Sequence, residues 1–247
     1  MLRTFAILAI AALAGAPSAN AEDLEVNDTG NFVPSARLSF DIAPREGPSV
    51  TAGPSVPHTG HGIEIGFSGA SVDDKQNIGV GDSPIVFGGR AFAAPAELRH
   101  EFDWRFLEIA YRYRHFFGSG KFGIEGMGGL GFAELDLTTT SAGLSASDKL
   151  SNGGLLAAFG IVWKFLPSTS LQSRITLFRS GSTEGVTGAA RLDVHVAHAL
   201  GRHAAVRAGL VGWGISSLRS DDDDASSLNS PLRVGFSGLS LGLDVAF

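Results

Sequence analysis

The sequence predicts an all-β protein, an antiparallel transmembrane β-barrel, and three observations support this fold class. Apolar and polar residues alternate with a period of two along most of the chain after residue 61, the pattern of strands with one apolar face. Most of these segments exceed the roughly 5 to 6 residues of soluble strands and reach the about 9 to 11 that a tilted membrane strand needs. Short and long connections alternate between them, as in outer-membrane barrels.

The composition limits the function classes. Of the 247 residues, 44% are hydrophobic and 18% are charged, with a formal net charge of -6; soluble domains usually have roughly 25% charged residues. An acidic chain lacks the cationic surface that nucleic-acid phosphates select, so we expect no nucleic-acid partner. The chain has no cysteine, which excludes disulfides, thiolate metal sites and cysteine nucleophiles.

Residues 1–21 have the three parts of a cleaved signal peptide. Arg3 supplies the positive charge, residues 5–16 are apolar, and Ala19-Asn20-Ala21 fits the cleavage site. No later apolar run is long enough for a membrane-spanning helix. We therefore expect an exported protein in which residues 22–61 form an N-terminal segment and residues 62–247 form the barrel.

Eight segments are predicted as strands; most of them alternate clearly, whereas 170–180 and 204–218 are strand-like with ambiguous faces. In the first, Ile63, Ile65 and Phe67 alternate with polar or small residues, and in the last one parity is apolar from Leu239 to Phe247. The predicted strands span residues 62–71, 98–117, 121–138, 153–166, 170–180, 189–200, 204–218 and 231–247.

The second segment contains a change of parity. Its apolar side runs through Phe102, Trp104 and Phe106 and then moves to Leu107 and the alternate residues after it. One extra residue in a strand has this effect, so we predict a β-bulge between Phe106 and Leu107.

The connections predict the orientation. Short links occur at residues 118–120, 167–169 and 201–203, whereas 72–97, 139–152, 181–188 and 219–230 are long. Short turns are periplasmic in outer-membrane barrels, and an even strand number places both termini in the periplasm. Aromatic girdles are expected at both interfaces. The girdle beside the short turns would contain Phe117, Phe122, Trp163, Phe165 and Phe247, and the opposite one Phe132, Trp213 and Phe236.

A ten-stranded barrel is the alternative. Residues 36–42 alternate but are too short to span alone, and residues 85–93 have no clear apolar face. The proline-rich residues 44–57 would be a linker in the eight-stranded barrel and an extracellular loop in the ten-stranded one.

With its signal peptide, even set of alternating strands and aromatic end, the chain resembles the small outer-membrane β-barrel superfamily, which includes OmpA-like and opacity-protein-like barrels. The resemblance covers residues 62–247 and implies a location in the outer membrane of a Gram-negative-type cell, with lipid and lipopolysaccharide as surroundings. It also implies that the barrel assembly machinery reads the last strand. The residues of that assembly signal are Leu241, Leu243, Val245 and Phe247.

Charged residues within the predicted strands form the candidate site. A charge facing hydrocarbon costs about 2 to 4 kcal/mol at the bilayer midplane, so the side chains should turn inward. We expect them to pair across a narrow lumen; the alternative is a gated polar path or a ligand site. The predicted lumen network consists of Arg99, Glu101, Asp103, Arg105, Glu108, Arg112, Arg114, Arg191, Asp193 and His195.

Three function classes follow. The first is a structural or surface-interaction protein with loops outside the cell, whose external ligand the sequence does not identify. The second is a narrow porin-like channel for small solutes, and the third is an outer-membrane hydrolase acting on lipid or surface polypeptide. Asp193 and His195 face the same side of a strand, as a general base and its orienting group would. No nucleophile motif accompanies them, so we assign no catalytic residue and expect no enzyme.

No metal or cofactor site is predicted. His195 and His198, three residues apart, face opposite sides of a strand. His58 and His61 offer two ligands without a third. The acidic block at 221–224 lacks the alternate spacing and the glycine turn of a calcium loop.

Overall fold

The computed structural model describes residues 24–41, 59–81, 84–87, 90–182, 185–201, 203–219 and 232–246. These residues form eleven strands, which confirms the prediction of an all-β fold. The predicted signal peptide, the proline-rich residues 44–57 and Phe247 lie outside the described residues.

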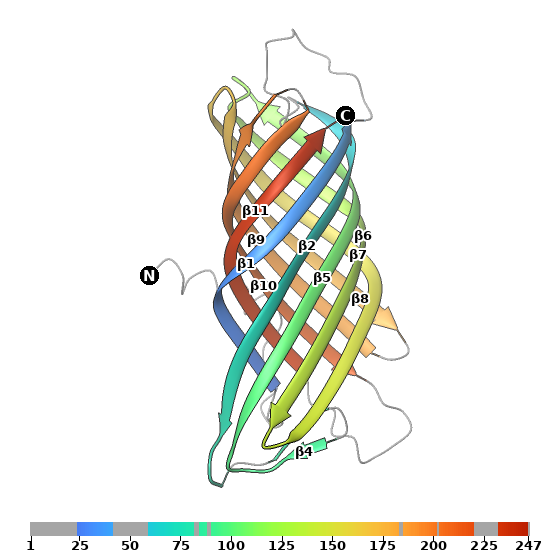
Figure 1. Cartoon of the computed structure of the whole chain (residues 1–247). Helices are drawn as coiled ribbons and strands as arrows, with labels where there is room; N and C mark the ends of the chain where they lie inside the picture. The colour runs from blue at the N-terminus through green and yellow to red at the C-terminus, as the bar shows by residue number, and fades with distance from the viewer. Residues whose placement is uncertain are drawn as a thin grey trace.

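Nine strands close into a ring in the order β1-β11-β10-β9-β8-β7-β6-β5-β2 (Figure 1). Neighbours in the ring are antiparallel except β1 and β11, which are parallel. Leu24 therefore lies beside Leu232 at the start of β11, at the opposite end of the ring from Ala246. The ring strands are β1 Leu24–Asp41, β2 Thr59–Ile78, β5 Ala96–Phe117, β6 Phe122–Ser141, β7 Leu144–Leu166, β8 Thr169–Ser182, β9 Gly185–Ala199, β10 Ala204–Arg219 and β11 Leu232–Ala246.

The ring differs from the predicted eight-stranded barrel by one strand. All eight predicted segments are strands, but β1 supplies a ninth from residues 22–61, so the ring begins before residue 62. An even strand number would place both termini at one end of the ring. Because the ring has nine strands, that prediction is wrong for the described ends of the chain, Leu24 and Ala246. Residues 85–93 do not join the ring as a tenth strand. They form β3 Ile85–Phe87 and β4 Arg90–Phe92, a separate two-stranded sheet.

Two of the predicted long loops are tight hairpins. β6 ends at Ser141 and β7 begins at Leu144, and Ala142 and Gly143 between them have φ angles of 44° and 84°. Two successive left-handed residues are typical of a two-residue hairpin turn. Likewise β8 ends at Ser182 and β9 begins at Gly185. Most of the predicted long loop at 219–230 lies outside the described residues.

On β5 the inward and outward side chains exchange polarity partway along the strand. Its residues alternate between buried and exposed from Leu98 to Arg114, and its ladders with β2 and β6 run past Phe106 and Leu107 without a register shift. The predicted bulge is therefore wrong. The apolar parity changes because the outward residues are charged up to Arg105 and apolar from Leu107 onward, while the inward residues change in the opposite sense.

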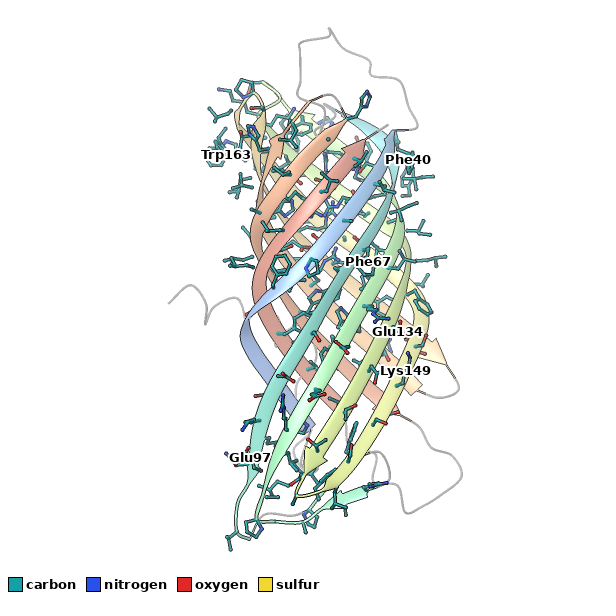
Figure 2. All side chains as sticks on the ribbon, viewed as in Figure 1. Phe40, Phe67, Glu97, Glu134, Lys149 and Trp163 are labelled. Carbon is teal, nitrogen blue, oxygen red and sulfur yellow. The ribbon has the colours of Figure 1, made fainter. Side chains whose placement is uncertain are left out.

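On β2 and β6, the neighbours of β5, the outward residues change from apolar to small or charged at the same level of the ladder. Leu107 lies opposite Phe67 and Phe132, whereas Arg105 lies opposite Gly69 and Glu134. Figure 2 shows the result, with Phe40, Phe67 and Trp163 on the upper part of the ring and Glu97, Glu134 and Lys149 on the lower part.

Two outer surfaces follow from this change. The apolar outer belt comprises Leu38, Phe40, Ile63, Phe67, Leu107, Ile109, Tyr111, Tyr113, Phe117, Phe122, Leu130, Phe132, Leu155, Phe159, Ile161, Trp163, Phe165, Ile175, Leu177, Val194, Val196, Val206, Leu210, Leu239, Leu241 and Leu243. The charged outer end comprises Asp73, Lys75, Glu97, Arg99, Glu101, Asp103, Arg105, Glu134, Asp136 and Lys149.

Inside the charged outer end the ring is filled by an aromatic layer, which consists of Phe102, Trp104, Phe106, Phe178, Trp213 and Phe236. The Trp104 and Trp213 ring centroids are 5.2 Å apart, and those of Phe106 and Phe178 are 5.3 Å apart. Gly131 makes room for them, since a Cβ there would come within 2.8 Å of both phenylalanine rings. Trp213 and Phe236 are buried, so their predicted place in an outer girdle is wrong.

The β3–β4 hairpin closes the buried apolar cluster at this end of the ring. Ile85 of β3 and Phe92 of β4 are both buried and belong to the same cluster as Leu98 and the aromatic layer. On β2, β5, β6 and β7 the lower part of the ring thus has the apolar interior and charged exterior of a water-soluble sheet.

We predict that Phe106→Ala lowers the free energy of unfolding by about 3 to 5 kcal/mol, because it opens a cavity among fully buried rings. Leu155→Ala is the matched control, since Leu155 is 72% exposed on the apolar outer belt. Urea unfolding of the purified protein, followed by tryptophan fluorescence, measures both. Equal losses in the two variants would contradict a packed aromatic layer.

Candidate functional site

A cluster of charged side chains fills the ring inside the apolar outer belt. All ring strands except β7 contribute to it, and nearly all of its members are less than 9% exposed. We call it the buried ion-pair network; its members are Arg37, Glu64, Glu108, Arg112, Arg114, Glu125, Arg174, Arg191, Asp193, Arg207 and Asp244.

Glu64 is at its centre and contacts three arginines from different strands. Its carboxylate lies 2.8 Å from Arg37 Nε, 2.6 Å from Arg174 Nη1 and 3.1 Å from Arg112 Nη1. Arg112 also donates a hydrogen bond to Ser39 Oγ at 3.0 Å. A fully buried carboxylate is stable only when such partners offset its lost hydration.

Glu125 forms a second centre that shares one arginine with the first. Arg114 Nε and Arg174 Nε each donate to it at 2.8 Å, through different carboxylate oxygens. Arg174 on β8 therefore bridges Glu64 on β2 and Glu125 on β6. These contacts join strands that are not neighbours in the ring, so they cross the interior and fill it.

A third group joins the network to the aromatic layer. Arg191 lies 3.1 Å from Glu108 and 2.8 Å from Asp193. Its guanidinium carbon is also 5.2 Å from the Trp213 ring centroid and 5.9 Å from that of Phe106, within the range of cation–π attraction. Arg191 thus contacts both the carboxylates of the buried ion-pair network and the rings of the aromatic layer.

The predicted lumen residues separate into two sets. Glu108, Arg112, Arg114, Arg191, Asp193 and His195 are buried inside the ring. The inward placement of the other four is wrong, because their side chains are exposed on the charged outer end; these are Arg99, Glu101, Asp103 and Arg105. The rule that turned them inward holds only where the outer surface is apolar, and these residues lie beyond the apolar outer belt.

The outward charges form exposed ion pairs instead. Lys75 lies 2.7 Å from Glu97, and Glu134 lies 2.6 Å from Lys149 and 3.6 Å from Arg105. The hydrogen bond from Lys149, with its positive charge, lowers the pKa of the Glu134 carboxyl below its usual value. Exposed pairs of this kind contribute little to stability and keep the outer surface hydrated.

Sequence reasoning missed about half of the network, namely Arg37, Glu64, Glu125, Arg174, Arg207 and Asp244. The signal was present: Glu64 stands between Ile63 and Ile65, and Asp244 between Leu243 and Val245. A single charge flanked by outward apolar residues marks an inward position. Arg174 lacked this signal, because its strand had no clear apolar face.

Asp193 and His195, the residues considered for catalysis, each contact a different partner. Asp193 accepts a hydrogen bond from Arg191 Nε at 2.8 Å, and His195 Nε2 lies 3.3 Å from Gln172 Oε1. The two share the interior without forming the acid–base pair considered from the sequence. Within the described ranges, no group of three or more His, Asp or Glu side chains is arranged to hold a metal ion.

A small cavity lies beside the network, where β1 meets β11. Its volume is about 10 Å³, which is room for one water molecule. Its lining includes Ser35 and Arg37 of β1, Ser240 of β11 and Arg207 of β10.

Comparison of the chain with protein-family models, with curated proteins and with solved structures gives no match. None of the described residues belongs to a helix with the length and apolar character needed to cross a membrane.

We predict that Glu64→Gln lowers the free energy of unfolding by about 3 to 5 kcal/mol, because it leaves three buried arginines short of one countercharge. Glu97→Gln, which removes an exposed partner of Lys75, should leave stability unchanged within error. Urea titrations of the two variants under the same conditions give the comparison. A Glu64→Gln variant as stable as the parent would contradict a structural role for the network.

Proposed function

We propose that this chain is an integral outer-membrane β-barrel with a closed interior and a structural or surface-interaction role. The observation that carries the proposal is the exchange of polarity between inside and outside at one level of β2, β5, β6 and β7, above which the apolar outer belt surrounds the ring. Above that level charges are buried and apolar side chains are exposed; below it the arrangement is that of a water-soluble protein.

The apolar outer belt has the exposure expected of a surface in contact with lipid. Leu155 is 72% exposed, and Leu130 and Leu239 are 63% exposed. Monomeric soluble proteins rarely expose contiguous apolar patches larger than a few hundred Å², and this belt surrounds the ring. On β5 it runs from Leu107 to Phe117, which matches the about 9 to 11 residues that a tilted strand needs to cross a bilayer.

The filling of the ring favours a closed barrel over a channel. Arg174 bridges Glu64 and Glu125 across the interior, and below them the aromatic layer fills the ring with apolar side chains. Solutes would have to break buried ion pairs and also displace packed rings. A narrow porin-like channel is therefore the less favoured function, and a hydrolase lacks a clustered acid, base and nucleophile among the described residues.

The charged outer end then projects from the bilayer as a continuation of the same strands. We place the short turns in the periplasm, so the charged outer end and the β3–β4 hairpin face the exterior, beside lipopolysaccharide. The exposed leucines of the last strand, Leu241 and Leu243, form with Val245 and Phe247 the segment that the barrel assembly machinery would read. Membership of the OmpA-like and opacity-protein-like superfamily belongs to the same proposal, with the odd strand number as a departure.

Single cysteines in this cysteine-free chain test the membrane placement. We predict that a fluorophore on Ile109→Cys or Leu155→Cys in lipid vesicles is quenched by brominated acyl chains. The same fluorophore on Glu101→Cys or Ser147→Cys should not be quenched, because these positions lie beyond the apolar outer belt. Equal quenching at all four sites would contradict the boundary, and absence of quenching at all four would contradict insertion.

The orientation has its own measurement. On intact cells, an impermeant thiol reagent should label Ser147→Cys at the charged outer end and leave Ser119→Cys in the turn after β5 unlabelled. Labelling of both positions after the outer membrane is permeabilised is the control for reactivity. The reverse pattern would invert the orientation while leaving the barrel itself in place.

Planar-bilayer recording separates the closed barrel from the channel. We predict no stable conductance from the inserted protein, because the network and the aromatic layer both close the interior. Folded protein, identified by its heat-modified mobility on a gel, must be present in the same preparation. Steady ion-selective currents that change with Arg112→Gln would overturn the closed interior and favour the channel.

A further inference from the structure

β1 is paired more weakly than any other strand of the ring. It runs parallel to β11, whereas the other neighbouring pairs in the ring are antiparallel, and parallel pairing is slightly less stable per residue. Its antiparallel ladder with β2 is short, with seven pairs from Ser35 opposite Ser68 to Asp41 opposite Gly62. By contrast, the ladder of β2 with β5 runs the whole length of β2.

Pro34 stands at the end of the β1–β2 ladder. It directly precedes Ser35, where the pairing stops, and proline has no N–H to donate to a neighbouring strand. From Gly69 to Ile78, β2 pairs with β5, and in the part of the chain that the structure describes this stretch has no ladder with β1. The lower part of β2 therefore has one paired side.

β1 nevertheless holds β2 and β11 in matching register. Ala36 lies opposite Phe67 on one side and Leu243 on the other, and Phe67 and Leu243 are both exposed on the apolar outer belt. β2 and β11 run in opposite directions, so without β1 they would pair as antiparallel strands. The same register would set Leu232 opposite Ile78 and Ala246 opposite Glu64, which gives each of the 15 residues of β11 a partner on β2.

The buried charges are also consistent with a ring that lacks β1. The buried ion-pair network contains six arginines and five carboxylates, and Arg37 is the contribution of β1. Without Arg37 the network has five of each sign, and Glu64 keeps Arg112 and Arg174. A small cavity lies at the β1–β11 boundary, and its lining includes Ser35 and Ser240.

We propose that β1 is an insertable ninth strand. The ring closes either with β1 between β2 and β11, as in this structure, or as eight antiparallel strands in which β2 pairs directly with β11. The exchange replaces one parallel ladder and one short ladder by a single long antiparallel ladder, and it releases residues 24–41 from the sheet. No side chain of β2 or β11 changes face, because the in–out register is the same in both forms.

Disulfide trapping in the full-length protein tests the exchange. In the nine-stranded ring, residues 67 and 243 are two strand spacings apart, about 9.5 Å, beyond the roughly 7 Å between Cα atoms that a disulfide can bridge. Phe67→Cys with Leu243→Cys therefore reports the eight-stranded ring. Ala36→Cys with Leu243→Cys reports the nine-stranded ring, and Leu210→Cys with Leu239→Cys, on the neighbouring strands β10 and β11, is the control for folding and oxidation.

The pairs are oxidised in lipid vesicles, and the intramolecular cross-link is measured in the folded, heat-modifiable band. We expect all three pairs to cross-link, with Phe67→Cys and Leu243→Cys reacting more slowly than the control. A pair at 67 and 243 that stays reduced while the other two are oxidised would overturn the proposal. Hydrogen exchange of the unmodified protein is the second measurement: β1 should exchange faster than β9 and β10 as one unit, and equal protection of all three would also overturn it.

Discussion

The pairing of Glu64 and Glu125 with buried arginines is the interaction on which the rest of the ring depends. Strand residues alternate in direction, so an outer surface made of apolar side chains leaves the interior as the place for the polar ones. Buried carboxylates without partners would destabilise the fold by several kcal/mol each. The planar fork of arginine contacts two carboxylates at once, and Arg174 does so across the ring. In the nine-stranded ring the network thereby spans the interior between opposite walls.

In the lower half of the ring the interior is filled by apolar side chains instead of charged ones. There the outer surface is charged and the aromatic layer fills the interior by burial of apolar area. The same strands run through both halves of the ring, so the fold is the same in both. The halves differ in which residue type, apolar or charged, occupies the inward and the outward positions. Arg191, in contact with Glu108 and with the Trp213 ring, is where the two fillings meet.

The strands could be predicted from the sequence because period-two alternation is a local property. Reasoning failed where one assumption, that charges face inward, was applied beyond the apolar outer belt, as at Arg99 and Arg105. Strand ends made of hydroxyl residues, such as 139–141, were interpreted as loops because neither parity is apolar there. Of β1, only residues 36–42 were considered as a strand, because alternation is clear only beyond Pro34, and the eight-stranded prediction left them out as too short. The contact of Arg174 with Glu64 joins residues 110 positions apart, which no local spacing encodes.

Whether the strand number is odd or even decides whether the two ends of the chain lie at the same end of the ring. With nine strands, Leu24 and Ala246 lie at opposite ends of the ring, so in a membrane whatever precedes Leu24 would be in a different compartment from whatever follows Ala246. With β1 released, the sheet would begin at β2, and an even number of crossings would allow both flanking segments to share one compartment. A single strand would thus determine on which side of the membrane the amino-terminal segment is presented, independently of any change in the loops.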